Sequence, residues 1–378
     1  MRIVIAPDSF KESMTALEAA HAIEAGFQEV FPQAEYLKIP MADGGEGTVQ
    51  SVIDATKGKI KRIVVTGPIG EKLEAFYGLS GDGKLAVIEM AAAAGLEKVP
   101  SDKRNPLLTT TYGFGELIVD VLNEGVEEIL LGIGGSGTND GGAGMVMSLG
   151  GKLFDKNGES IQPTGAGLKD LVNMDLTDLH LGIEEVTIRV ACDVDNPLTG
   201  ENGAAYIYGP QKGANPEQVI ELDQNLKNYA QVIKNKLQKD IDEVPGAGAA
   251  GGLGAGLLVF LNAELEAGGS LVADLMNLEE KIKHADLVIT GEGGINHQTI
   301  FGKTPIAVSK IAKKYQVPVI AFSGALNKGH ESIYQEGITA AFSIIPELNS
   351  LEKTLKQGSV NLKNTAMNVA QLLKINFL

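Results

Sequence analysis

The sequence has a single cysteine, Cys192, and no tryptophan. One cysteine cannot form an intramolecular disulfide, and the five histidines make no H-x-x-x-H pattern that would suggest a zinc site. No apolar run approaches the ~18 residues of a membrane span, and residues 1–7 are too short a stretch for a signal peptide. These absences predict a cytoplasmic protein without structural disulfides or zinc.

Positive charge is also scarce, with 32 Lys and Arg against 48 Asp and Glu and a formal net charge of −16. Nucleic acids and anionic membranes require a basic surface, so the charge argues against both as general partners. An acidic exterior mainly keeps a protein soluble. If the protein binds an anion, it must gather its few basic residues and backbone amides locally.

The 378 residues favour two domains, since domains usually hold roughly 100 to 200 residues. Hydrophobic residues make up 44% of the chain but aromatics only 5%. The core must therefore be built from Ala, Val, Ile and Leu, which suits helices packed on a parallel sheet. The 47 glycines exceed the usual share of ~7% and gather between strand-like and helix-like runs, which indicates loops.

Four predicted strands, at residues 2–6, 35–39, 286–290 and 317–322, each end in acids, glycines or hydroxyls. A capping box, Thr15 to Glu18, predicts a helix after the first strand, and Pro305 fits the first turn of another. We expect one α/β sheet from both chain ends, with ligands at the carboxyl ends of its strands. The long insertion has its own expected strands and helices (strands 85–90, 127–133 and 186–192; helices 110–123 and 218–237). Only residues 246–256 are glycine-rich enough to suggest low complexity.

Residues 132–137 match G-x-G-x-x-G after a predicted strand, and Asp155 lies at a suitable distance for a ribose contact. The motif continues into Asp140, however, whose charge would repel a phosphate unless a cation intervened. We therefore favour a phosphate or metal loop over a dinucleotide fold, with tight glycine packing as the alternative. The candidate binding residues in this loop are Ser136, Gly137, Thr138, Asn139 and Asp140.

Gly302-Lys303-Thr304 looks like the end of a P-loop, but the required first glycine is His297. Lys303 is then an isolated phosphate-binding charge before a helix, or simply a solvated lysine. Lys11 and Lys212 are further candidates for binding an anion. The sequence does not decide whether Lys11, Lys212 or Arg62 holds a substrate carboxylate.

Acidic residues in glycine-rich turns are the more informative signal. Asp43 and Glu46 are bracketed by Gly44, Gly45 and Gly47, and Glu292 lies between two glycines. Such carboxylates can bind Mg²⁺ through oxygen, although a turn or helix-cap role is commoner for Asp. Asp193 and Asp195 point the same way if the backbone is extended, so they could supply a general base beside a metal ligand. The alternative is a turn before Pro197.

Five motifs, in this order along the chain, resemble the bacterial type 1 glycerate kinases: DSFKES (8–13), MADGGEGT (41–48), GGSGTNDGG (134–142), ACDVDNPL (191–198) and TGEG (290–293). The resemblance extends from residue 1 to about residue 345. It implies ATP-dependent phosphorylation of D-glycerate with Mg²⁺, usually at the 2-hydroxyl. It also implies a flavodoxin-like doubly wound parallel sheet from residues 1–66 and 286–378. An inserted α/β domain, 67–285, would have a restriction-endonuclease-like core, with the active site in the cleft between the domains.

The chain departs from the family after TGEG, where the family normally has an arginine and then, two positions later, an aspartate. Gly294 and Asn296 stand here instead. Asn296 can accept a hydrogen bond or coordinate a metal through its carbonyl, but it carries no charge and is not a base. A metal ligand or proton acceptor of that loop has therefore been lost or reassigned.

Phosphoryl transfer needs alignment, charge neutralisation and a base for the hydroxyl proton. We assign Asp43, Glu46 and Glu292 to the metal or nucleotide side, and Lys11 and Lys303 as cationic partners. Asp193 is the expected general base, with Asp8 second, while Asp195, Lys212 and Asn296 complete the substrate or phosphate side. 2-Phosphoglycerate is favoured over 3-phosphoglycerate as product, and a homodimer is left open. A nicotinamide oxidoreductase using residues 132–137 and a non-catalytic glycerate or nucleotide sensor are the alternatives.

Overall fold

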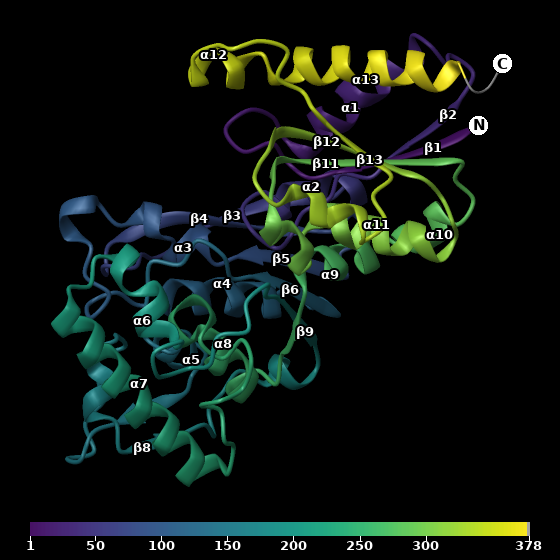
Figure 1. The fold of residues 1–378 in the computed structure, drawn as a ribbon. Coiled ribbons are helices and arrows are strands. Elements are labelled where there is room, and N and C mark those ends of the chain that lie inside the picture. Colours follow the sequence, from purple (N-terminus) through teal and green to yellow (C-terminus); the bar gives the residue numbers. More distant parts are fainter. Residues whose placement is uncertain (376–378) are drawn as a thin grey trace. The chain divides into compact units, whose positions relative to one another are not determined.

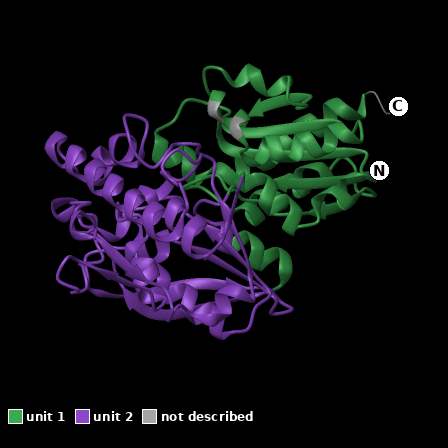
Figure 2. Ribbon diagram, turned by 90° about the horizontal axis from the view of Figure 1, so that it is seen from below, with its two compact units in different colours: residues 1–43, 50–57, 267–378 green, residues 44–49, 58–266 purple. Residues whose placement is uncertain are grey.

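The computed structural model describes residues 1–375, apart from the side chains of Gln298 and Phe301. The chain forms two compact units (Figure 2). The smaller unit combines both chain ends, Met1–Asp43, Gln50–Lys57 and Ala267–Leu378, and the larger one contains Gly44–Val49 and Gly58–Glu266. Within residues 1–375 no helix combines the length and the apolar character needed to cross a membrane.

The smaller unit is built on a five-stranded parallel sheet in the order β13-β12-β11-β1-β2. Helices α1 and α13 cover one of its faces, and α11 packs on the other (Figure 1). Its strands are β1 (Arg2–Pro7), β2 (Glu35–Lys38), β11 (Leu287–Ile295), β12 (Val319–Leu326) and β13 (Ala340–Ser343). Its helices are α1 (Ala16–Gln28), α9 (Gly268–Leu275), α10 (Leu278–Ile282), α11 (Thr304–Lys314), α12 (Leu351–Lys356) and α13 (Gly358–Lys374), together with α2 (Thr48–Thr56) except for its first two residues, which belong to the larger unit.

Local sequence explains the first strand and helix of this unit. Ile3 and Ile5 in β1 are fully buried against Ile23 and Phe27, which lie one helical turn apart on α1. The capping box expected at the start of α1 is present, because the Thr15 hydroxyl accepts from the Glu18 amide and the Glu18 carboxylate accepts from the Thr15 amide. This prediction is confirmed.

The larger unit has a six-stranded mixed sheet in the order β10-β9-β6-β5-β4-β3 and a small β7-β8 pair. Strands β5, β6, β9 and β10 are parallel, and β3 and β4 are antiparallel additions at one edge. The strands are β3 (Lys59–Thr66), β4 (Lys72–Leu79), β5 (Leu85–Glu89), β6 (Glu128–Gly132), β7 (Lys152–Phe154), β8 (Asn173–Asp175), β9 (Thr187–Ala191) and β10 (Glu264–Glu266). The helices are α3 (Ala91–Ala94), α4 (Tyr112–Asn123), α5 (Ala143–Ser148), α6 (Ala204–Tyr208), α7 (Pro216–Leu237) and α8 (Ala249–Phe260).

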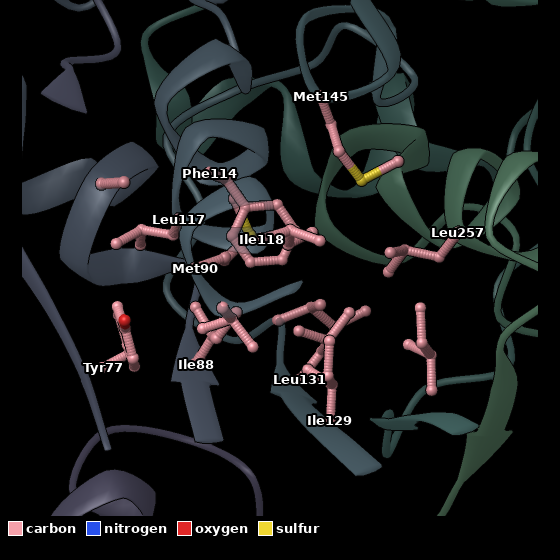
Figure 3. Packing of buried hydrophobic residues seen from close by; sticks show 14 of the residues in the cluster. Tyr77, Ile88, Met90, Phe114, Leu117, Ile118, Ile129, Leu131, Met145 and Leu257 are labelled. Carbon is pink, nitrogen blue, oxygen red and sulfur yellow. The ribbon is translucent and has the colours of Figure 1, made fainter. Parts of the chain in front are cut away.

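The core of the larger unit lies between α4 and its parallel strands (Figure 3). Phe114, Leu117 and Ile118 recur at helical spacing on α4 and are fully buried over Ile88 and Ile129 of β5 and β6. Both strands read as continuous apolar runs because they are covered on both faces, as parallel strands usually are. The expected core of aliphatic residues is what the structure contains.

The bounds of the two units differ from the expected division at residues 66 and 285. Strand β3 pairs with β4 along its whole length, so residues 59–66 belong to the sheet of the larger unit. At the other end, α9 and α10 pack against α11 and therefore join the smaller unit. Neither assignment could be read from the local sequence, because both depend on contacts between segments.

The glycine-rich tract at residues 246–256 is ordered structure rather than low complexity. It includes the start of α8, where Ala250, Gly251 and Gly252 have left-handed backbone angles that kink the helix. A Cβ on Gly251 would lie 2.1 Å from the carbonyl oxygen of Thr138. The tract therefore packs directly beneath the loop at residues 134–142, which requires residues without side chains.

Candidate active site

Polar residues of the smaller unit gather at the carboxyl end of its sheet. Asp8 follows β1 directly and its amide donates to the Gly291 carbonyl of β11 at 2.8 Å. Glu292 is paired with Ser323 of the next strand, β12. The expectation that these strand ends share one edge is confirmed. Because β1 lies between β2 and β11, the strand order reverses here, which is where ligands bind in open α/β sheets.

Glu292 was expected in a loop after a strand ending at residue 290, and this expectation is wrong. Strand β11 continues to Ile295, and its pairing with β12 extends as far as Leu326. The glycines that suggested a turn serve close packing instead, since a Cβ on Gly291 would lie 2.2 Å from the Phe322 carbonyl oxygen. Glu292 is therefore held by a rigid strand.

Asp8 is buried, with 8% of its surface exposed. Its carboxylate accepts from the Thr304 hydroxyl at 2.6 Å and from the Ser9 amide at 2.6 Å. Burial, together with the charges of Asp43 and Glu292, raises the pKa of Asp8 to about 7, although the two hydrogen bonds oppose this shift. The carboxylates of Asp43 and Glu292 thus lie close enough to Asp8 to affect its ionisation, at the buried end of β1.

Glu292 links the strand end to the segment that departs from the expected family pattern. Its carboxylate accepts from the Thr299 hydroxyl at 2.8 Å and lies 3.4 Å from the Lys303 ammonium. The Thr299 hydroxyl in turn accepts from the backbone amide of Asn296 at 3.2 Å. Burial raises the pKa of the Glu292 carboxyl, with Lys303 opposing the shift. Asn296 is therefore connected to Glu292 through a single intermediate residue, Thr299.

Lys303 immediately precedes α11, close to where Pro305 predicted the helix start. Burial lowers its pKa, but the charges of Glu292, Asp43 and Asp8 outweigh burial and raise the pKa overall. Lys303 is thus a protonated partner of the carboxylates, not a solvated lysine. Lys11, the other expected cation of this unit, has an exposed side chain on the loop after Asp8.

In the larger unit, the loop at residues 134–142 is open only at its beginning. Gly134 and Gly135 are exposed, Ser136 is half-buried, and Thr138, Asn139 and Asp140 are fully buried. The Asp140 carboxylate accepts from the Thr111 amide and hydroxyl, both at 2.8 Å, and from the amides of Gly142 and Gly144, both at 3.2 Å. Asp140 therefore holds the loop together, and burial raises its pKa despite these bonds.

Lys212 was expected to bind an anion, but only 1% of its surface is exposed. Its ammonium donates to the Thr138 carbonyl at 2.7 Å. Burial lowers the pKa of Lys212 to about 7, while the Asp140 charge opposes the shift. Lys212 thus supports the same loop from below, and an anion could reach it only if the loop moved.

Asp193 and Asp195 follow β9 and are both exposed, as is Glu46. Glu46 belongs to the larger unit, whereas Asp43 and Glu292 belong to the smaller one. Among the described side chains, no three or more His, Cys, Asp or Glu are grouped closely enough to hold a metal ion. The assignment of Asp43, Glu46 and Glu292 as metal ligands therefore stays a prediction.

The geometry does not favour the dinucleotide-binding alternative. In that fold the glycines of the motif open a helix whose N-terminus faces the pyrophosphate. Here Gly132 ends β6, and α5 begins only at Ala143 and has six residues. The intervening chain bonds to the end of α3 instead, where the Gly137 amide donates to the Ala94 carbonyl at 2.9 Å.

Three contacting residues were not identified from the sequence. Thr299 and Thr304 bond Glu292 and Asp8, and their only signal is a position just before or at the start of a helix. Glu89 ends a predicted strand, but its carboxylate accepts from the Gly47 and Val49 amides. An acid at the end of a buried strand was the signal that could have identified Glu89.

These features define an α/β enzyme with acids and a lysine at the switch point of a parallel sheet. The chain belongs to the glycerate kinase family, whose model matches residues 3–374. It is 57% identical to the glycerate kinase of Halalkalibacterium halodurans over 97% of both chains. It is 52% identical to the glycerate 2-kinase of Escherichia coli K12, over 99% of this chain and 98% of that one. A crystal structure from Salmonella typhimurium LT2 matches with a TM-score of 0.93 at 52% identity, covering 100% of this chain and 99% of that one. The protein is thus a kinase that transfers a phosphoryl group to an alcohol.

Proposed function

We propose that the protein transfers the γ-phosphoryl group of ATP to the 2-hydroxyl of D-glycerate, giving 2-phosphoglycerate. The choice of hydroxyl is carried by the relative from Escherichia coli, which is named glycerate 2-kinase and is 52% identical over nearly the whole chain. The acidic cluster with Lys303 is the part of the structure that suits phosphoryl transfer, because this chemistry depends mainly on metal-assisted charge neutralisation and alignment.

The residues at the end of β1 fit a Mg²⁺ ion by the chemistry of their donors. Mg²⁺ prefers carboxylate oxygens and retains several waters, so it does not need a closed cage of protein ligands. Burial and the charges of Asp43 and Glu292 raise the pKa of Asp8, and burial and the Asp43 charge raise the pKa of Glu292. A divalent cation would relieve this repulsion. Asp43 and Glu292 would hold the ion, which would neutralise charge on the nucleotide phosphates, and Glu46 is a further candidate ligand.

Lys303 and the helix that follows it fit the phosphate side. The N-cap residue of α11, Lys303, makes no side-chain cap bond. The first amides of α11 lie beside the start of α9, where a Cβ on Gly269 would be 3.0 Å from the Thr304 nitrogen. Helix N-termini attract anions through unpaired amides and the helix dipole. Ser136, which is half-buried, and Gly137, which follows it and is buried, are further candidates for phosphate or substrate contacts in the loop at residues 134–142.

Asp193 is the proposed general base that receives the proton of the glycerate hydroxyl, with Asp195 beside it and Asp8 as the second candidate. Lys11 is the proposed cation for the substrate carboxylate. In the smaller unit, the strands taken in chain order are arranged 2-1-3-4-5, the order of flavodoxin-like sheets, which supports that finer description. We retain a restriction-endonuclease-like core as the proposal for the larger unit.

The decisive experiment incubates the purified protein with ATP, Mg²⁺ and D-glycerate and identifies the product by phosphorus NMR. We expect the phosphorus resonance of 2-phosphoglycerate and a stoichiometric amount of ADP. Formation of 3-phosphoglycerate would contradict the choice of hydroxyl while retaining the kinase. L-Glycerate is the matched control, because it has the same charge and groups in the opposite configuration.

A further inference from the structure

The glycine-rich segment Gly44–Val49 rests on one row of residues across three strands of the larger unit. Glu89, Gly132 and Ala191 are the last residues of β5, β6 and β9, and they pair with one another in register. The Gly47 and Val49 amides donate to the Glu89 carboxylate at 3.1 and 2.8 Å. The carboxyl edge of this sheet is thus where the segment is anchored.

The fit between the segment and the strand ends leaves no space for a side chain at Gly44 or at Gly132. A Cβ on Gly44 would lie 2.0 Å from the Ala191 Cβ, and one on Gly132 would lie 2.4 Å from the Gly44 carbonyl oxygen. Gly44 and Gly47 also have positive φ angles, 84° and 93°, which favour glycine. Contact with the sheet therefore sets the position of this backbone, and Glu89 provides its polar attachment.

Glu89 is the one charged residue of this row. Only 6% of its surface is exposed, and a buried carboxylate is costly unless it is well hydrogen-bonded. Its bond to the Val49 amide lies in the first turn of α2, where the unpaired amides and the helix dipole favour a negative charge. Burial raises the pKa of Glu89, while the bonds from Val49 and Gly47 oppose the shift. Glu89 thus holds the backbone of Gly47 and Val49, which belong to the same unit.

We propose that Glu89 is a positioning residue for the kinase reaction, holding the segment that carries Glu46 and directly follows Asp43. This inference rests on the proposed function, in which Asp43 and Glu46 serve the metal or nucleotide side. Glu89 touches no substrate in this role and acts through the backbone of Gly47 and Val49. Its removal leaves both amides without their acceptor and frees the segment to shift by the ~1 Å that can cost a reaction about 10²-fold.

The test compares Glu89→Ala and Glu89→Gln with the wild type in two measurements. Hydrogen exchange of the peptide covering residues 44–56, read by mass spectrometry, reports whether the amides are still held. We expect faster exchange in both variants, more so for Glu89→Ala, because the glutamine oxygen can still accept one bond. We expect kcat to fall about tenfold for Glu89→Gln and about 10²-fold for Glu89→Ala, with KM for D-glycerate changed little.

Asp223→Asn is the matched control, because Asp223 is an equally buried acid of the same unit that accepts from the Gly200 amide at 2.7 Å. It should lower Tm without changing kcat or the exchange of residues 44–56. Unchanged exchange in Glu89→Ala overturns the inference, and so does faster exchange with an unchanged kcat per folded molecule. If the wild type does not phosphorylate glycerate, the proposed function fails, and the exchange data alone decide whether Glu89 holds the segment.

Discussion

At the scale of single residues, ionisation of Asp8 in the proposed site should make the stability of the folded protein depend on pH. Its pKa rises on folding from an ordinary 3.8 to about 7, so the folded protein binds this proton more tightly than the unfolded chain does. Stability from this group is therefore present at low pH and is lost as the pH rises through that window. A buried carboxylate that costs stability at neutral pH is typical of functional sites.

We predict that Asp8→Asn removes this pH dependence. In EDTA, the Tm of the wild type should fall between about pH 4 and pH 7 relative to that of Asp8→Asn, which cannot ionise at this position. At pH 7 the free energies of unfolding of the two proteins should differ by an amount on the order of 1–3 kcal/mol. Thermal unfolding across the pH series measures it. Parallel curves for the two proteins would mean that Asp8 is not protonated in the folded state.

A second residue-scale prediction concerns Asn296. The backbone amide of Asn296 donates to the Thr299 hydroxyl, which donates to the Glu292 carboxylate, so residue 296 lies near the acidic cluster. Asn296→Asp should lower the Mg²⁺ concentration for half-maximal activity by about fivefold, since an added charge at this distance is worth ~1 kcal/mol. Steady-state rates across a Mg²⁺ titration test this.

Other outcomes for Asn296→Asp are equally informative. Higher turnover at saturating Mg²⁺, with a new acidic limb in the pH profile, would assign the acid to proton transfer instead. No change in either quantity would make residue 296 a bystander. Asn327→Asp is a useful control, because Asn327 directly follows the neighbouring strand β12 and its backbone amide donates to the Ile295 carbonyl at 2.8 Å rather than to Thr299.

At the scale of elements, the docking of Gly44–Val49 on β6 gives a steric prediction. Gly132→Ala introduces no backbone strain but places a methyl group 2.4 Å from the Gly44 carbonyl oxygen. Because β6 is central in its sheet, the segment should move rather than the strand, and turnover should fall at least about tenfold. Kinetics and Tm are the measurements. Gly182→Ala is the control, since its Cβ would meet only the His180 ring at 3.2 Å and Leu122 at 3.5 Å.

The positions of helices and strands were the most predictable feature of this structure from its sequence. The contacts between them were the least predictable. Apolar runs and the capping box at Thr15 located β1, β11 and α1 to within a few residues, because those signals are local. The end of β11 was misjudged because glycines signal turns, whereas here Gly291 allows close strand packing. Glu89 and Thr304 were missed because their partners are 40 and 296 residues distant along the chain.

At the scale of the whole molecule, the chain divides its candidate catalytic groups between two units. Asp8, Asp43, Glu292 and Lys303 belong to the smaller unit, and Asp193 and Asp195 to the larger one. The smaller unit is itself discontinuous in sequence, so the larger unit is an insertion between its second and third strands. If one phosphoryl transfer uses both sets of residues, mutations in the two units should not act independently.

We therefore predict coupling between Asp193→Asn and Asp43→Asn. Alone, Asp193→Asn should lower turnover by roughly 10² or more while leaving nucleotide binding nearly intact, as expected when a positioned base is removed. Asp43→Asn should lower turnover and raise the Mg²⁺ requirement.

In the double variant the combined loss of turnover should be smaller than the product of the two single losses, because without the base the reaction gains less from metal-assisted alignment. Asp193→Asn with Asp223→Asn is the control pair, and its effects should multiply. Fully multiplicative losses for Asp193 and Asp43 would show that the two acids serve separate steps, and unchanged turnover in Asp193→Asn alone would transfer the role of base to Asp8.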